Sequence, residues 1–269
     1  MDTLLFIVIT ILVFITSLCF GSFLNVVIYR LPNNMSLIKP GSHCTTCNTP
    51  IKWYDNIPII SYIFLRGRCR YCHSKISIRY PLVEGITAIL STLIFLYYKV
   101  EWISLFAILL LYAFIAIEEI DRKYLIIPDS IVIFIALISI IETIVYKDGV
   151  YGYDNYISKL IMLGISIIFA LLIILIEKLL KREVMGGGDL KLIAAVGIFL
   201  GYQMTLFGIA IASIIGVIIE LGFKKLLKRE KDEKGSSILP FGPYLIIGFL
   251  ISLLFSHYFF SWYLSLMGL

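Results

Sequence analysis

Two aspartates, Asp121 and Asp189, stand next to long apolar runs in this sequence. Asp121 closes the run that ends in "AIEEID", and Asp189 follows three glycines in "VMGGGDLK". An ionisable side chain at the edge of a run long enough to cross a bilayer is costly and indicates a functional residue. Two adjacent carboxylates share a proton, so one acts as a base while the other acts as an acid. Such a pair can activate water for attack on a peptide bond without a covalent intermediate.

The glycines before Asp189 suit a site that a substrate strand approaches. Gly186, Gly187 and Gly188 have no side chains, so the backbone can bend sharply and admit a second chain closely. Asp189 is then expected at a helix N-terminus, where the helix dipole favours its charged form. The alternative is an N-cap aspartate after a flexible loop, which is a common feature without catalytic meaning.

Four other acidic residues compete for a functional role. Glu118 and Glu119 lie within a turn of Asp121. Glu84 lies early in the second apolar run, deeper than a surface charge needs to be, and could instead pair with Arg30 or Arg79. Asp129 directly follows Pro128, and this order predicts an N-cap at the start of the next helix. None of these positions by itself separates a structural role from a chemical one.

Four cysteines form two CxxC pairs, which is the spacing of a metal site. Cys44, Cys47, Cys69 and Cys72 lie in one polar loop, with 21 residues between the pairs. Two such pairs predict a tetrahedral four-thiolate zinc site that closes a small module over about residues 40–76. Two disulfides, or redox or catalytic thiols, are the alternatives. His43 and His73 flank the pairs, but four thiolates already complete the zinc shell.

The elements that must position these residues are apolar helices. Of the 269 residues 60% are hydrophobic and only 15% are charged, and the mean hydropathy is +0.97. Such a composition excludes a soluble globular domain and predicts an all-α polytopic membrane protein with a small cytoplasmic zinc-binding loop domain. About eight transmembrane helices are expected, with six or seven as the alternative, over residues 4–28, 82–98, 102–119, 130–146, 158–179, 189–201, 203–222 and 241–262.

The basic residues predict how these helices are oriented. Twenty of the 23 Lys and Arg residues fall in four segments that alternate with the spans. The positive-inside rule places these segments in the cytoplasm and both termini outside. The net charge of +5 then reflects topology and attraction to anionic lipid, and not binding to nucleic acid. The four basic segments are 29–81, 120–129, 178–191 and 223–240.

The last span opens with "LPFGPYL", which contains Pro240, Gly242 and Pro243. Two prolines so close remove backbone donors, so we expect an irregular helix start with free carbonyls at the membrane edge. Such backbone is tolerated there only beside protein or a water-filled cavity. We therefore expect this segment to hold a substrate strand near the aspartates; the alternative is a helix-entry turn without substrate contact.

Taken in order, these motifs resemble the bacterial type IV prepilin peptidases over nearly the whole chain. Any one of the motifs is weak, whereas their order, spacing and membrane context are specific. They are "GSFLNVVIYRLP" at 21–32, the two CxxC pairs around "IKWYDNIPIISY", "ISIRYPLVE" at 76–84, "IDRKYLIIPD" at 120–129, "GGGDLKL" at 186–192 and "LPFGPYL" at 239–245.

The resemblance implies a membrane aspartyl protease of the GxGD type. Asp121 matches the first catalytic aspartate, and Asp189 matches the aspartate of the GxGD motif, read here as "GGGD". The implied substrates are prepilins or pseudopilins with a short basic leader, cleaved after a glycine at the cytoplasmic face of the bacterial cytoplasmic membrane. S-adenosylmethionine then methylates the new N-terminal amine, and retention of all four cysteines favours this second activity.

The resemblance does not place the S-adenosylmethionine site by a motif of its own. The sequence has no glycine-rich fingerprint for S-adenosylmethionine, and Asn25, Arg30 and Glu84 are candidates only because they lie in family-like segments. Glu118 and Glu119 replace the apolar residues that more usually precede the first aspartate.

Two domains are predicted, and other functions remain open. Residues 1–81 are expected to hold the first helix and the zinc and methyltransferase-associated module, and residues 82–269 the membrane-embedded peptidase bundle. The alternatives are a peptidase without methyltransferase activity, a transporter, and a non-catalytic zinc-stabilised scaffold. Acids at one membrane edge, and the lack of an inverted repeat, argue against a transporter.

Overall fold

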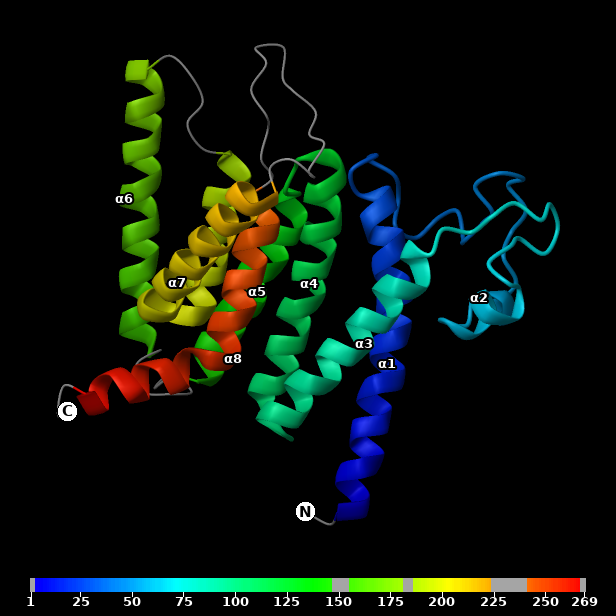
Figure 1. The fold of residues 1–269 in the computed structure, drawn as a ribbon, viewed down its shortest axis with the longest axis horizontal. Coiled ribbons are helices and arrows are strands. Elements are labelled where there is room, and N and C mark those ends of the chain that lie inside the picture. The colour runs from blue at the N-terminus through cyan, green and yellow to red at the C-terminus, as the bar shows by residue number, and fades with distance from the viewer. Residues whose placement is uncertain (1–2, 147–154, 181–185, 224–240, 267–269) are drawn as a thin grey trace. The chain divides into compact units, whose positions relative to one another are not determined.

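The structure is a computed structural model, and it describes residues 3–146, 155–180, 186–223 and 241–266. Within these ranges the chain is helical, and β-structure is limited to two isolated bridges. The all-α prediction is thereby confirmed. The elements of Figure 1 are α1 (Thr3–Arg30), a 3-10 turn η1 (Trp53–Asp55), α2 (Ile60–Phe64), α3 (Arg79–Tyr98), α4 (Trp102–Tyr124), α5 (Asp129–Val145), α6 (Tyr156–Leu180), α7 (Gly187–Phe223) and α8 (Gly242–Leu266).

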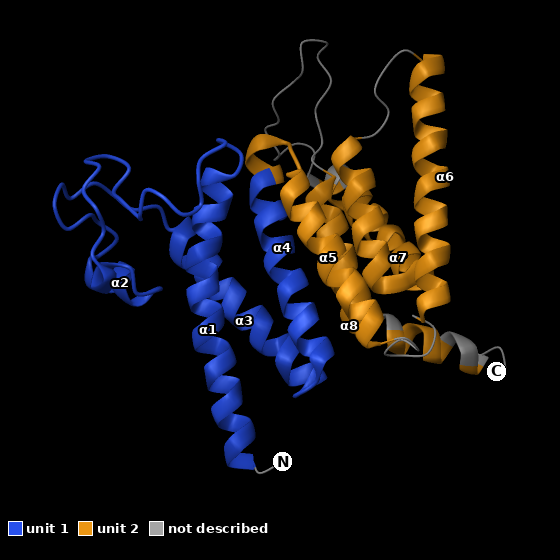
Figure 2. Ribbon diagram, turned by 180° about the vertical axis from the view of Figure 1, so that it is seen from behind, with its two compact units in different colours: residues 1–120 blue, residues 121–269 orange. Residues whose placement is uncertain are grey.

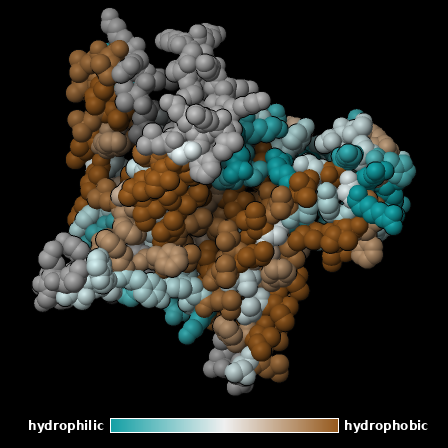
Figure 3. Space-filling model, in the orientation of Figure 1, coloured by the Kyte–Doolittle hydropathy of each residue, from teal (hydrophilic) through white to brown (hydrophobic). Residues whose placement is uncertain are grey.

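Five of these helices are long and apolar enough to cross a membrane: α1, α3, α4, α6 and α7. Their side chains are not folded inward as in a soluble protein, since only 11% of the apolar window of α1 and 17% of that of α6 is buried. Figure 3 shows the hydrophobic surface that results along the helices. The chain is a multi-pass membrane protein, although the count of eight spans is not confirmed.

The chain divides into two compact units, residues 1–120 and residues 121–269 (Figure 2). In the first unit α1 packs along α3. Their crossing needs a glycine, because a Cβ at Gly21 would stand 2.7 Å from the Cα of Glu84. The second unit contains α5 to α8, with α5, α6 and α8 all packed on α7. The functional division at residue 81 stays a prediction.

Helix α7 covers two of the predicted spans, residues 189–201 and 203–222, and its backbone is broken between them. Gly201 has φ 74° and ψ 173°, a backbone conformation outside the helical region that favours glycine. The half before Gly201 packs on α5, where Ser139 Oγ donates to the carbonyl of Ala195 at 3.2 Å. The half after it packs on α8, where Ser252 Oγ donates to the carbonyl of Met204 at 2.6 Å.

The two halves of α7 run in opposite directions. A straight helix of its 37 residues would be roughly 55 Å long at the standard helical rise. Instead, Gly188 at its start packs on Ile127, and Gly216 near its end packs on Tyr244. Tyr244 lies in the first turn of α8, and Gly242, the first residue of α8, lies against Asp121. The start and the end of α7 therefore lie in the same part of the unit.

Candidate functional site

Asp121 lies in the last turn of α4 and is 6% exposed. The helix ends because Leu125 adopts a positive φ of 55°, while its N–H still donates to the carbonyl of Asp121 at 2.9 Å. Gly242, the first residue of α8, lies directly against this carboxyl group. A Cβ at position 242 would stand 2.5 Å from Oδ2 and 3.1 Å from Cγ of Asp121. Any larger residue there must displace the carboxylate.

Asp189 lies in the first turn of α7, as the sequence predicts, and its side chain is half-buried. It is the third residue of the helix, which begins at Gly187, and its N–H donates to the carbonyl of Gly186 at 3.1 Å. The alternative of an N-cap aspartate is therefore wrong. The carboxylate turns back over Gly186, where an added Cβ would stand 3.3 Å from Oδ2.

The segments that carry the two aspartates are in contact. A Cβ at Gly188 would stand 3.0 Å from the Cβ of Ile127, six residues after Asp121 along the chain. Glycine at 188 thus allows the start of α7 to lie on the connection between α4 and α5. Together with Gly242, it gathers three separate sequence motifs around one carboxylate-bearing region of the second unit. The sequence indicated Gly188 and Gly242 as candidate residues, but it did not predict that they contact Ile127 and Asp121.

The start of α8 is more regular than predicted. Pro243 occupies the first turn of the helix, where its missing N–H has no intrahelical partner to lose. The carbonyl of Phe241 accepts the N–H groups of Tyr244 and Leu245, both at 3.1 Å. The expected free carbonyls are thus not present over the described part of this motif, and Pro240 lies outside the described residues.

The competing acids have structural partners. Asp129 is the first residue of α5 and not its cap, which is Pro128; its Oδ1 accepts from Lys191 Nζ at 2.7 Å on the surface. Glu119 lies 3.9 Å from the guanidinium of Arg79. Glu118, like Glu119, is half-buried on α4.

The three cofactor candidates are all buried in the first unit. Arg30 donates to the carbonyls of Ser36 and Gly41, at 3.0 and 3.2 Å, and so closes the loop after α1. Glu84 Oε2 accepts the N–H of Ile59 at 2.8 Å. The suggested pairing of Glu84 with either arginine is therefore wrong.

Asn25 differs from the other two candidates in having an unused acceptor. Its Nδ2 donates to the carbonyls of Gly21 and Tyr80, at 3.3 and 3.1 Å. Its Oδ1 is buried and accepts no hydrogen bond. Of the three side chains, that of Asn25 therefore has a polar atom left over for a ligand.

The four cysteines of the loop meet, as predicted. Their sulfur atoms all lie within 4.8 Å of one another, and Cys44 Sγ and Cys72 Sγ are 3.8 Å apart. A tetrahedral zinc with bonds of about 2.3 Å separates its sulfurs by about 3.8 Å, so the cluster has the size of a zinc site. Hydrogen bonds from backbone N–H groups lower the pKa of the Cys44 thiol to about 6, and that of Cys47 has a larger effect than that of Thr46.

Each cysteine pair is held by the same local fold. Cys44 N–H donates to the carbonyl of Thr49, and Cys69 N–H to that of Ser74, at 3.0 and 2.9 Å. The residue after each pair, Asn48 or His73, has a positive φ, of 56° and 57° respectively. Two matching turns thus present their thiols to a common centre. The histidines contribute no ligand atom to the cluster.

Comparison with known proteins identifies the family. Residues 15–98 match the bacterial peptidase A24 N-terminal domain, and residues 105–221 match the type IV leader peptidase family. Proteins named prepilin leader peptidase/N-methyltransferase are similar over most of the chain. The one from Aeromonas salmonicida strain A449 is 33% identical, over 94% of this chain and 93% of its own.

The chain belongs to the type IV leader peptidase family. The relative from Legionella pneumophila is 32% identical over 93% of this chain and 92% of its own. That from Neisseria gonorrhoeae is 36% identical over 76% of this chain and 78% of its own. No solved structure gives a significant match.

In this leader peptidase the cysteines and the aspartates fall in different family domains. The match to the N-terminal domain contains all four cysteines, and the match to the peptidase domain contains both Asp121 and Asp189. The peptidase match ends before α8, so Gly242 is added to the site by the tertiary structure.

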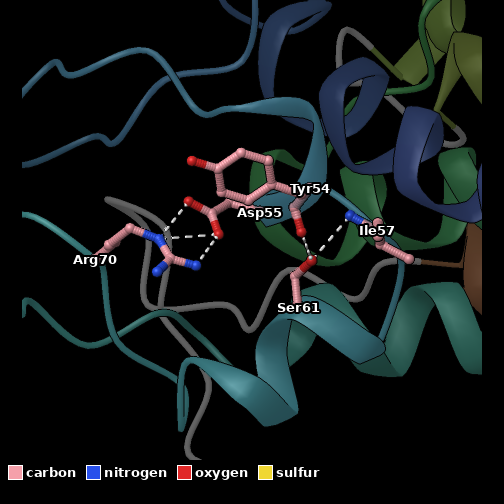
Figure 4. A network of polar contacts seen from close by, with 5 residues as sticks. All are labelled: Tyr54, Asp55, Ile57, Ser61 and Arg70. Carbon is pink, nitrogen blue, oxygen red and sulfur yellow. Dashed lines mark hydrogen bonds and ion pairs between the residues drawn. The ribbon is translucent and has the colours of Figure 1, made fainter.

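The cysteine module of the leader peptidase is braced by polar contacts (Figure 4). Arg70 forms an ion pair with Asp55, and its hydrogen bonds hold the pKa of the Asp55 carboxyl below its usual range. Ser61 Oγ donates to the carbonyl of Tyr54 and accepts the N–H of Ile57, both at 2.9 Å. Sequence reasoning missed these residues, since a lone serine or an Asp–Arg pair 15 residues apart carries no local signal.

Proposed function

We propose that this chain cleaves the leader from prepilins or pseudopilins at the cytoplasmic face of the membrane and methylates the new N-terminal amine. The names of its relatives support both activities. The observation that carries the proposal is the double contact around Asp121. Gly242 lies on its carboxylate, and Gly188 packs the start of the Asp189 helix on the chain that follows it.

The chemistry requires two carboxylates that hold one proton between them. The ionised carboxylate takes a proton from water as the water oxygen bonds to the peptide carbonyl carbon. The protonated carboxyl then donates its proton to the leaving nitrogen as the C–N bond breaks. Asp121 is buried and Asp189 is half-buried at the membrane edge. Burial disfavours two charges at once and therefore favours this shared-proton state.

The glycines would admit the substrate in this proposal. Gly187 meets no atom within 4 Å of an added Cβ, so the start of α7 has open space on that side. An extended peptide could lie there with its scissile bond beside Asp189. Pro243 would fix the start of α8, so that Gly242 stays against Asp121.

We propose that Cys44, Cys47, Cys69 and Cys72 hold a structural zinc ion. The metal would supply folding free energy to a loop too small for its own core. Four thiolates leave no open position for water, so zinc would take no part in peptide hydrolysis.

The proposed methyl donor is S-adenosylmethionine, whose sulfonium supplies an electrophilic methyl group when bound. Asn25, Arg30 and Glu84 remain our candidates for its site. Asn25 Oδ1 could accept a hydrogen bond from the ligand, whereas Arg30 and Glu84 would shape the site by holding the loops around it. The amine to be methylated must be neutral, so a nearby acceptor for its proton would assist the transfer.

The orientation that we propose follows the basic segments. The cysteine module of about residues 40–76 and the connection after α4 would face the cytoplasm, where the positive-inside rule places the segments 29–81 and 120–129. A cytoplasmic site also keeps the four thiols reduced and able to bind metal. Membrane lipid and the pilin precursor would be its partners.

Mass spectrometry of a co-expressed prepilin tests the proposal. Asp121→Asn and Asp189→Asn should each lower cleavage by at least about 100-fold, because an amide cannot exchange the catalytic proton. Asp129→Asn is the matched control, since its carboxylate forms a surface ion pair and should be dispensable.

A precleaved peptide with a free N-terminus separates the two activities. Methylation of this peptide should survive in both aspartate variants. Near-normal prepilin cleavage by either variant would remove that aspartate from the site. If the unmodified protein cleaves the prepilin without methylating it, the chain is a peptidase only. If the prepilin stays intact, the transporter and scaffold hypotheses are the ones that remain.

A further inference from the structure

The cysteine module exposes a group of large apolar side chains outside the spans. Trp53 is 80% exposed, Phe64 81%, Ile63 66% and Ile60 51%. These four residues, from η1 and α2, are called the docking face below. Large apolar side chains exposed together on a polar module indicate an interaction site.

The docking face begins next to a membrane-spanning helix. The N–H of Ile59, directly before α2, donates to Glu84 of α3 at 2.8 Å. A Cβ at Gly85 would stand 3.7 Å from Ile59 Cδ1. Both α3 residues lie within two turns of its start at Arg79. In Figure 1 α2 is drawn to the side of α1, at a height that falls within the length of that helix and not beyond its end. The headgroups of a bilayer are expected near the start of a membrane-spanning helix, and the attachment of Ile59 close to the start of α3 puts the docking face near that level.

Internal polar contacts hold the docking face outward. Ser61 uses its hydroxyl to join Tyr54 and Ile57, and Arg70 is paired with Asp55 (Figure 4). The polar side of this segment is thereby turned toward the module. The apolar side, with Ile63 and Phe64, cannot exchange places with it without breaking these bonds.

Basic side chains lie beside the docking face. A hollow of about 490 Å³ is lined by Phe64, Leu65, Arg66, Arg68, Cys69, Arg70 and His73. Arg70 is neutralised by Asp55, whereas Arg66 and Arg68 form no ion pair with any described residue. Exposed aromatic residues next to unpaired arginines are the composition of an interfacial segment that binds anionic lipid.

We propose that the docking face lies in the headgroup region of the membrane, with Arg66 and Arg68 binding the phosphate of an anionic phospholipid. The α1 and α3 helices tether the module at its two ends, so the lipid surface is always within its reach. Contact with lipid would hold the cysteine module against the bilayer. The proposal does not depend on the aspartates or on the methyl donor.

Tryptophan fluorescence of the full chain tests this placement. The protein has three tryptophans, and a Trp102→Phe, Trp262→Phe background leaves Trp53 as the reporter. It is placed in lipid discs of brominated phosphatidylcholine, alone or mixed with phosphatidylglycerol. We expect the Trp53 emission to be blue-shifted and quenched by bromine. The quenching should be stronger in discs with phosphatidylglycerol, and high salt should reduce it.

Variants separate charge recognition from apolar contact. Arg66→Gln with Arg68→Gln should lower quenching in the anionic discs several-fold, to the level of the neutral discs. Lys39→Gln, an exposed basic residue of the same loop, should leave quenching unchanged. Zinc content of each variant reports whether the module remains folded, and prepilin cleavage is measured separately.

Three results would overturn the proposal. Red-shifted emission without quenching would leave Trp53 in water. Blue-shifted emission without quenching would show that protein, and not lipid, covers the docking face. Equal quenching in neutral and anionic discs, unaffected by the arginine variants, would exclude recognition of anionic lipid. A failure of cleavage alone would bear only on the peptidase proposal.

Discussion

Gly242 decides how closely the last helix can approach Asp121. A hydrogen in place of a Cβ allows α8 to begin against the carboxylate, which would otherwise meet a carbon atom 2.5 Å from Oδ2. The carboxylate thus has one side fixed by backbone. Packing of this kind helps to hold a carboxyl group in place for the catalytic role that we propose for Asp121.

We predict that Gly242→Ala slows prepilin cleavage by roughly 100-fold, because displacement of a reacting group by about 1 Å has an effect of this size. Gly164→Ala is the matched control, since an added Cβ there meets nothing within 4 Å. Cleavage rates in detergent, normalised to the amount of folded protein, provide the measurement. Wild-type activity in Gly242→Ala would mean that the carboxylate has room to move without loss of function.

At the level of elements, the cysteine module shows how short segments are ordered without a core of their own. Its helix α2 has five residues and its turn η1 has three. Helices this short are unstable in isolation. Two matching cysteine turns, the Asp55–Arg70 pair and the Ser61 bonds replace the missing apolar core.

Replacement of a cysteine should therefore affect the two activities unequally. We predict that Cys72→Ser lowers bound zinc well below one ion per chain and weakens methylation, because the module loses its closure. Cleavage should fall less, since both aspartates lie in the other compact unit.

Metal analysis beside both assays checks this prediction. Cys19→Ser, on the exposed surface of α1, is the control and should keep full metal content. Full methyltransferase activity in a metal-free Cys72→Ser preparation would contradict the role assigned to zinc.

For the molecule as a whole, a buried ion pair joins the helices of the second unit. Lys159 of α6 binds Glu142 of α5, and their side chains are only 2% and 1% exposed. Ser158, next to Lys159, accepts the N–H of Tyr202 at 3.2 Å, directly after the break in α7. Polar groups thus fasten α5, α6 and the turn of α7 where apolar packing alone would not fix their register.

We predict that Glu142→Gln lowers the free energy of unfolding by about 3–5 kcal/mol, because Lys159 is left as an uncompensated buried charge. The double variant Glu142→Leu, Lys159→Met should recover most of this loss. Asp129→Asn, which breaks the exposed pair with Lys191, should change stability by less than about 1 kcal/mol. Thermal unfolding in detergent is the measurement. A double variant as unstable as the single one would show that the pair contributes more than charge neutralisation.

Much of this protein is determined by local sequence. Apolar runs too long for a soluble protein predict helices in a membrane, because every backbone polar group must be satisfied within the helix there. The Cys44–Cys72 cluster followed from CxxC spacing, since each pair closes its own turn. Asp189 was expected in the first turn of a helix because glycines precede it and an apolar run follows.

Long-range contacts were not predictable in this way, because they join residues whose spacing along the chain is arbitrary. Nothing local pairs Gly242 with Asp121, or Gly188 with Ile127. The break of α7 at Gly201 likewise brings the end of that helix back onto Tyr244 of α8. Glu84 likewise accepts a hydrogen bond from the backbone of Ile59 and pairs with neither Arg30 nor Arg79. A buried carboxylate must be hydrogen-bonded, and the tertiary packing determines which donor is close enough. Sequence determined which residues could act and the helices that carry them. The tertiary structure decided which of them meet, since close packing brings distant segments together only where their side chains leave room.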